Sequence, residues 1–171
     1  MIHIYHGDGK GKTTAALGLA FRMLGNGKKA FVVQFLKGKT SGEILMLLKM
    51  DRVTVLHGKP ETKFTFQMNR AELEEARALH NRQLQLAFTA AADGRADMIV
   101  LDEALDAIMA DTLDEGELLR LIALNKDKAE IVITGRNPSN DLLSVADYIT
   151  HMKKEKHPYD AGVQARKGIE Y

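Results

Sequence analysis

The sequence His6-Gly-Asp-Gly-Lys-Gly-Lys-Thr-Thr14 lies almost at the N-terminus of this 171-residue chain. Glycine lacks a Cβ atom and tolerates positive φ, so a loop containing Gly7, Gly9 and Gly11 can turn backbone N–H groups toward phosphate oxygens. Residues 2–5 before it read as a strand, and the alanine-rich residues 13–24 after it read as a helix. This order predicts a nucleotide phosphate site at a helix N-terminus, and it disfavours the alternative of a lysine-bearing surface turn.

The loop is one residue shorter than the usual phosphate loop. The standard pattern has four residues between its first glycine and the Gly-Lys pair, which would place a glycine at position 6, where this chain has His6. Counting from Gly7 leaves only three residues before Gly11. We therefore expect the loop to hold a phosphate chain differently from an ordinary NTPase. Within it, Lys12 is expected to reach phosphate oxygens and Thr13 to offer its hydroxyl to Mg²⁺.

Composition and charge restrict the class of protein. The length fits a single domain over residues 1–171, with residues 153–171 as a C-terminal tail, and 45% hydrophobic content fits a folded core. A net charge of +1 gives no case for nucleic acid or membrane partners. The chain has no cysteine, which excludes disulfides and thiolate metal sites. No apolar run reaches membrane-spanning length and no signal peptide is recognisable, so we expect a cytoplasmic protein.

Apolar β-rich runs alternate with helical patterns, which predicts an α/β fold with a mostly parallel sheet flanked by helices. The expected strands are residues 2–5, 30–35, 53–56, 96–103, 130–134 and 148–152. The expected helices are residues 13–24, 42–50, 70–92, 104–109, 114–124 and 139–146. Residues 57–69 read as irregular.

Charged residues follow two of the expected strands. Asp102 and Glu103 end one of them, as in the second nucleotide-binding motif, where a carboxylate meets Mg²⁺. The alternative is that they only cap the next helix. Arg136 follows the expected strand at residues 130–134, so it would lie at the same carboxyl edge of the sheet as the phosphate loop, near a phosphate. The alternative is a surface arginine after a turn. Arg22 lies roughly 15 Å along the helix from Lys12, which by itself favours a structural role.

Two aromatic residues, Phe64 and Phe66, lie in the irregular segment before a polar helix. Aromatic side chains in a loop can close the edge of a core. The alternative function is a platform for a large flat ligand. The sequence pattern leaves both interpretations open.

Together, these segments resemble the ATP:corrinoid adenosyltransferases of the cobalamin-biosynthetic type. The matching segments are residues 7–14, 33–38, 64–66, 100–103, 133–136, 156–163 and 168–171. The resemblance implies a P-loop NTPase-like (RecA-like) sheet. It also implies transfer of the 5′-deoxyadenosyl group of ATP to the Co(I) centre of a corrinoid (cobalamin, cobinamide or cobyrinic acid a,c-diamide), with release of triphosphate. The alternatives are a small P-loop NTPase or kinase acting at the γ-phosphate, and a nucleotide-sensing module without turnover.

The resemblance also implies roles for individual residues. Lys12 would counter the charge of the leaving triphosphate, Thr13 and Glu103 would serve Mg²⁺, and Asp102 would support Glu103. Residues implied to hold ATP are Gly7, Asp8, Gly9, Lys10, Gly11, Lys12, Thr13, Thr14, Arg22 and Arg136.

For the second substrate, the resemblance places Phe64 and Phe66 near the lower face of the corrin. There they would exclude a lower axial ligand and favour the four-coordinate cobalt from which Co(I) forms. Some relatives have a tryptophan where this chain has Phe66. The resemblance further implies a homodimer and a flavodoxin-like or flavin reductant. Better-known relatives carry an N-terminal extension that can help to cover the site. Here the alternatives are that the corrin pocket is more open, or that the partner subunit and the C-terminal tail cover it.

Overall fold

The computed structural model describes residues 1–37, 41–58 and 65–170. These residues form one six-stranded sheet in the order β3-β2-β4-β5-β1-β6, and every neighbouring pair is parallel. The strands are β1 Ile2–His6, β2 Ala30–Gln34, β3 Val53–His57, β4 Met98–Asp102, β5 Glu130–Gly135 and β6 Tyr148–His151. The predicted α/β fold with a parallel sheet is confirmed.

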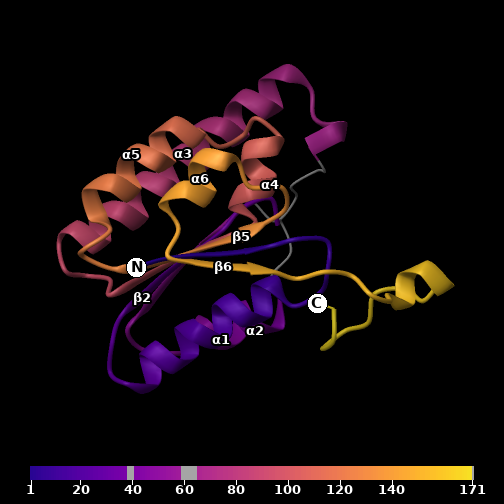
Figure 1. The fold of residues 1–171 in the computed structure, drawn as a ribbon, viewed down its shortest axis with the longest axis horizontal. Helices are drawn as coiled ribbons and strands as arrows, with labels where there is room; N and C mark the ends of the chain where they lie inside the picture. The colour runs from indigo at the N-terminus through magenta and orange to yellow at the C-terminus, as the bar shows by residue number, and fades with distance from the viewer. Residues whose placement is uncertain (38–40, 59–64, 171) are drawn as a thin grey trace.

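Helices cover both faces of the sheet (Figure 1). The first two helices lie on one face, and the remaining four lie on the other, above the sheet in the view of Figure 1. The helices are α1 Lys12–Gly25, α2 Gly42–Leu47, α3 Arg70–Ala92, α4 Ala104–Met109, α5 Glu115–Asn125 and α6 Asn140–Val145. Short 3₁₀ turns are η1 Thr65–Gln67 and η2 Pro158–Ala161. No described helix has the length and apolar character that a membrane crossing requires.

The central strands are apolar except near their ends, because both of their faces are buried. Side chains alternate between the two faces with a period of two. Val32, Val100 and Val132 pack toward α1 and α2, whereas the residues on either side of each, such as Ile99 and Leu101, pack toward α3 and α5. This alternation fixes the register of each strand. Because the strands are parallel, all of their carboxyl ends lie at one edge of the sheet.

Most element boundaries agree with the sequence prediction, and the differences concentrate near the site. The predicted strand over 96–103 is observed only as Met98–Asp102, because Glu103 turns into the left-handed region with φ 61. The predicted helix over 42–50 ends earlier, at Leu47. In the segment predicted to be irregular, β3 extends to His57 and η1 forms at Thr65–Gln67.

His80 is a buried histidine on α3, and its side chain predicts an acid-sensitive fold. It is 4% exposed, packs edge-on against Phe35 and forms a hydrogen bond with the backbone of Thr112. Burial lowers its pKa from 6.5 to about 4. As the pH falls, His80 takes up a proton in the unfolded chain near pH 6.5 but in the folded protein only near pH 4. Between these two pH values the free energy of unfolding therefore decreases, by about 3 kcal/mol in total.

We expect wild-type protein to lose ~2 kcal/mol more unfolding free energy than His80→Gln on going from near pH 7 to near pH 5. Urea denaturation at both pH values measures the difference. An identical pH dependence in the two proteins would contradict this account of His80.

Candidate active site

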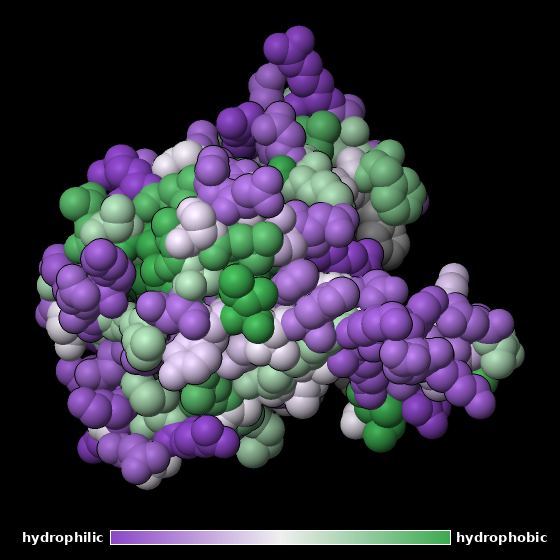
Figure 2. Space-filling view, in the orientation of Figure 1, coloured by the Kyte–Doolittle hydropathy of each residue, from purple (hydrophilic) through white to green (hydrophobic). Residues whose placement is uncertain are grey.

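The carboxyl edge of the sheet contains a cavity of about 570 Å³, within the usual size of a small-molecule site. It is lined by the loop residues 8–14, by residues 36, 37, 41, 43, 65, 103 and 106, by residues 134–136, and by the tail residues 157, 169 and 170. In Figure 2 the C-terminal segment projects from the body of the molecule with a mainly hydrophilic surface. The predicted phosphate loop, strand-end acids and tail therefore lie around one cavity.

The N-terminus of α1 faces this cavity, and the backbone N–H groups of its first turn give it partial positive charge. Asn69, Asp114 and Ser139 cap α3, α5 and α6 with their side chains. Among the described residues, by contrast, none caps α1 through its side chain, and its first turn contains no acid. Backbone N–H groups at such an end attract anions, and the helix dipole adds to the attraction.

The phosphate loop is fastened to the segment that follows β6. Gly9 N–H donates to the Met152 carbonyl at 2.7 Å, and Met152 N–H donates to the His6 carbonyl at 2.7 Å. The Asp8 carboxylate accepts from Lys154 N–H at 3.0 Å. We call these three hydrogen bonds the loop clamp. The clamp ties the loop to the chain that follows β6.

His6, which stands where the usual loop has a glycine, belongs to the sheet. It is the last residue of β1, and its register partners are Gly135 on one side and His151 on the other. The His6 and His151 rings stack with centroids 4.8 Å apart and planes 9° from parallel. Burial lowers the pKa of His6, and His151 and Lys12 lower it further. The loop is thus short because β1 continues through His6, the position at which the usual loop has its first glycine. The stacked rings of His6 and His151 lie at this end of the strand.

The loop clamp requires a glycine at position 9. A Cβ built on Gly9 would lie 2.6 Å from the Met152 carbonyl oxygen and 2.9 Å from the Lys153 carbonyl carbon, both of them backbone atoms. We expect Gly9→Ala to displace the loop and lower kcat/KM by about 100-fold, because small errors in position are costly in catalysis.

Gly18→Ala is the matched control for this substitution. Gly18 lies on α1 with nothing within 4 Å of a built Cβ, so alanine there should stabilise the helix by about 0.5–1 kcal/mol and leave activity intact. Steady-state kinetics and thermal melts of both variants test the prediction. Full activity in a folded Gly9→Ala protein would show that the clamp does not position the loop.

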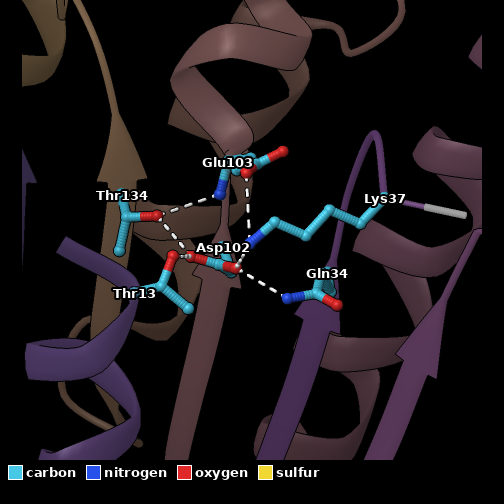
Figure 3. A network of polar contacts seen from close by, with 6 residues as sticks. All are labelled: Thr13, Gln34, Lys37, Asp102, Glu103 and Thr134. Carbon is cyan, nitrogen blue, oxygen red and sulfur yellow. Dashed lines mark hydrogen bonds and ion pairs between the residues drawn. The ribbon is translucent and has the colours of Figure 1, made fainter. Parts of the chain in front are cut away.

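Asp102 is the centre of a polar network at the end of β4 (Figure 3). It is 1% exposed, and its carboxylate accepts four hydrogen bonds. The donors are the hydroxyls of Thr13 (2.8 Å) and Thr134 (2.7 Å), the side-chain amide of Gln34 (2.9 Å) and the ammonium of Lys37 (3.3 Å). Asp102 thereby ties α1, β2 and β5 together beneath the cavity.

Glu103 diverges from Asp102 because its backbone takes the left-handed conformation, which costs a non-glycine residue about 1–2 kcal/mol. Its N–H donates to the Thr134 hydroxyl at 2.9 Å, and its carboxylate lies 3.1 Å from the Lys37 ammonium. Burial raises the pKa of Glu103, and Lys37 opposes that rise only in part. Burial alone would lower the pKa of Lys37, but attraction to Asp102 and Glu103 outweighs it and raises the pKa.

Two cations face the cavity beside the loop. The Lys12 ammonium donates to the Gly9 carbonyl at 2.7 Å, and Arg136 lines the cavity from the turn after β5. Burial lowers the pKa of Lys12, and the nearby positive charge of Arg136 lowers it further. The attraction of an anion in the cavity would offset both effects, so the charges of the site favour a polyanion.

Eight of the ten residues predicted to bind ATP line the cavity, and Gly7 and Arg22 do not. Arg22 lies in the last turn of α1 and is not part of the cavity lining. At that end of a helix, the helix dipole stabilises a positive charge. Phe64 lies outside the described residues. Phe66 is 81% exposed on η1, and its neighbour Thr65 lines the cavity. The roles predicted for these residues stay predictions.

Sequence reasoning missed several charged residues of the site, among them Lys37 and Asp106. Lys37 bridges Asp102 and Glu103, and Asp106 lines the cavity near Lys12 and Arg136. A signal for Lys37 did exist, because it follows a buried strand whose carboxyl end meets the phosphate loop.

The donor set of the site fits Mg²⁺. Thr13 uses its proton to reach Asp102, which leaves its oxygen lone pairs available, and the Glu103 carboxylate lines the same cavity. The described residues contain no cluster of three or more acidic, histidine or cysteine ligands. Mg²⁺ commonly needs only one or two protein oxygens because waters and substrate phosphates complete its octahedron.

The parallel sheet, the glycine-rich loop at an uncapped helix and the strand-end acids define a P-loop-like nucleotide-binding protein. The sequence matches the family described as "ATP:corrinoid adenosyltransferase BtuR/CobO/CobP" over residues 1–171. The chain belongs to this family.

Individual relatives agree with the family match. The chain is 36% identical to the corrinoid adenosyltransferase of Escherichia coli (strain K12) over 171 residues, covering 100% of this chain and 85% of the relative. It is 34% identical to the corrinoid adenosyltransferase CobA of Salmonella typhimurium, with the same coverage of each chain. The corrinoid adenosyltransferase of Pseudomonas aeruginosa is 32% identical over 98% of this chain and 82% of its own length.

Proposed function

We propose that this protein transfers the 5′-deoxyadenosyl group of ATP to the Co(I) centre of a corrinoid and releases intact triphosphate. The observation that carries the proposal is the convergence of the uncapped α1 N-terminus, Lys12 and Arg136 on one cavity, in a chain that belongs to the adenosyltransferase family. The alternative of an NTPase or kinase is not favoured by the family.

The reaction is a displacement at C5′ of the ribose. An electron pair of Co(I) forms the cobalt–carbon bond while the C5′–O bond breaks, and the electrons of that bond leave with triphosphate. Cobalt itself is the nucleophile, so the protein needs no side-chain nucleophile or general base. Its contribution is to position the reactants and to stabilise charge that develops on the leaving group.

Lys12, Arg136 and the first turn of α1 would bind this leaving group. Lys12 would exchange its bond to the Gly9 carbonyl for a triphosphate oxygen. Thr13 and Glu103 would hold Mg²⁺, which when bound neutralises part of the triphosphate charge. Asp102 would orient the Thr13 hydroxyl, and Lys37 would hold Glu103 in place.

We propose that Phe64 and Phe66 contact the lower face of the corrin. The support within the described residues is that Phe66 presents an exposed aromatic ring next to Thr65, which lines the cavity. An apolar wedge there would exclude an axial ligand from cobalt. Such exclusion eases reduction of Co(II) and matters less once Co(I) has formed.

Phe66→Ala is therefore expected to slow adenosylation from Co(II) corrinoid plus reductant at least several-fold more than adenosylation from preformed Co(I). The two assays are run with the same ATP concentration. Leu124→Ala, which truncates an exposed apolar residue of α5, is the control and should change neither rate. Equal losses in both assays for Phe66→Ala would remove the axial-ligand role.

Family membership also supports three proposals about the cellular setting. We propose that the enzyme is a homodimer, that it works in the cytoplasm, and that a flavodoxin-like or free flavin donor reduces the corrinoid. Sedimentation analysis tests the first, and reconstitution with reduced flavodoxin tests the last.

Product analysis tests the proposed activity directly. ATP is mixed with chemically reduced cobalamin, the visible spectrum is followed for cobalt–carbon bond formation, and released phosphates are separated by ion exchange. We expect one triphosphate for each adenosylated corrinoid. Production of ADP without corrinoid would indicate the kinase or NTPase alternative, and ATP binding without any product would indicate a sensor. Comparing rates for cobalamin, cobinamide and cobyrinic acid a,c-diamide then identifies the preferred acceptor.

A further inference from the structure

Asp106 is a carboxylate in the cavity that is proposed to bind a polyanion. It lies in the first turn of α4 and lines the cavity. Its carboxylate accepts a hydrogen bond from the backbone N–H of Arg136. A Cβ built on Gly135 would lie 2.8 Å from its Oδ2 atom. The carboxylate is therefore fixed against the turn that carries Arg136.

The charges around Asp106 are the two cations assigned to triphosphate. Arg136 and Lys12 are the groups whose positive charge acts most strongly on its carboxylate. Asp106 in turn attracts the Lys12 ammonium, which Arg136 repels. Before ATP binds, this negative charge offsets part of the repulsion between the two cations.

Three other carboxylates at the cavity have direct partners outside the pair Lys12 and Arg136. Glu103 pairs with Lys37, Asp8 accepts from Lys154 N–H in the loop clamp, and Glu170 pairs with Arg166 of the tail. For Asp106, the two strongest charged neighbours are the two cations that the incoming anion would bind.

This arrangement has a cost and a use. A like charge at close range weakens binding of triphosphate, both as part of ATP and as the free product. Free triphosphate carries more negative charge than it does within ATP, so the repulsion acts more strongly on the product. A site with Lys12, Arg136 and a helix N-terminus alone would retain the product.

We propose that Asp106 limits the affinity of the site for free triphosphate and thereby sets the rate of product release. The inference rests on the proposed function for its role in turnover. Its binding component depends only on the cavity and can be tested without any corrinoid.

The experiment measures binding of sodium tripolyphosphate by titration calorimetry. Asp106→Asn keeps an oxygen to accept from Arg136 N–H but removes the charge, so we expect tripolyphosphate to bind about tenfold more tightly. Asp127→Asn makes the same charge change at an exposed position in the turn before β5, at the opposite edge of the sheet, and should leave the affinity unchanged. Asp106→Ser provides a second charge-removing variant should the asparagine protein fold poorly.

Kinetics supply the second measurement. Slower product release predicts that steady-state turnover of Asp106→Asn falls more than its single-turnover adenosylation rate. Unchanged or weaker tripolyphosphate binding in folded Asp106 variants would overturn the inference, and weaker binding would indicate that Asp106 helps to hold the anion or its cation. Tighter binding in a protein that adenosylates no corrinoid would uphold the charge effect while refuting the proposed function.

Discussion

We expect Lys12→Met to slow single-turnover adenosylation by about 100- to 1,000-fold, the loss typical of removing one group that stabilises charge in the transition state. Lys12 lies at the start of α1, and its ammonium faces the cavity while bound to the Gly9 carbonyl. Methionine keeps most of the length and apolar character of the side chain and removes the ammonium group, with its charge and its hydrogen-bond donors. The rate is measured with preformed Co(I) corrinoid and saturating ATP, so that reduction and ATP affinity do not contribute.

Lys10→Met is the matched control, because Lys10 belongs to the same loop but is half exposed and lies 3.9 Å from Glu170 of the tail. A pair in that setting contributes little, so we expect less than a tenfold loss. Comparable losses in the two variants would mean that the loop acts through its overall charge. A Lys12→Met enzyme with nearly normal rate would place the leaving-group cation elsewhere, with Arg136 as the first candidate.

Asp102→Ala is expected to destabilise the fold by about 3–5 kcal/mol. Alanine leaves the Thr13 and Thr134 hydroxyls and the Gln34 amide without their acceptor at the end of β4, and it removes one of the two carboxylates that pair with Lys37. Urea denaturation near pH 7 measures the change in unfolding free energy.

Asp102→Asn separates charge from hydrogen bonding. If the asparagine oxygen faces Gln34 and Lys37, its NH₂ group faces two hydroxyl oxygens that can rotate to accept. We therefore expect a smaller destabilisation, about 1–2 kcal/mol. If alanine changed stability by less than ~1 kcal/mol, the network would have little structural importance, and its purpose would be confined to orienting Thr13 and Glu103.

The fold was predictable because its signals are local and repeated. Buried strands such as 30–34 and 130–135 contain continuous apolar runs, residues 30–33 and 131–133, and the helices between them carry a regular apolar face. Parallel strands then bring their carboxyl ends to one edge, which is why the positions of Glu103 and Arg136 at the cavity followed from the sequence.

The missed residues depend on single backbone conformations. Lys37 turns back over Asp102 after Leu36, which takes φ 57, and Asp106 reaches the cavity from a predicted helix that starts directly after Glu103, which takes φ 61. Non-glycine residues rarely adopt such angles, so no pattern in the sequence predicts them. The loop clamp was also unpredictable, because it joins Gly9 to Met152 across most of the chain.

That long-range connection has a consequence for how the protein matures on the ribosome. The phosphate loop is synthesised well before β6 and Met152, which pair with β1 and the loop. A nascent chain can form helices and several strands early, but contacts between segments so far apart in sequence must wait. Nucleotide affinity should therefore develop only after β6 has been synthesised, so that ATP selectively stabilises chains that contain β6 over chains truncated before it.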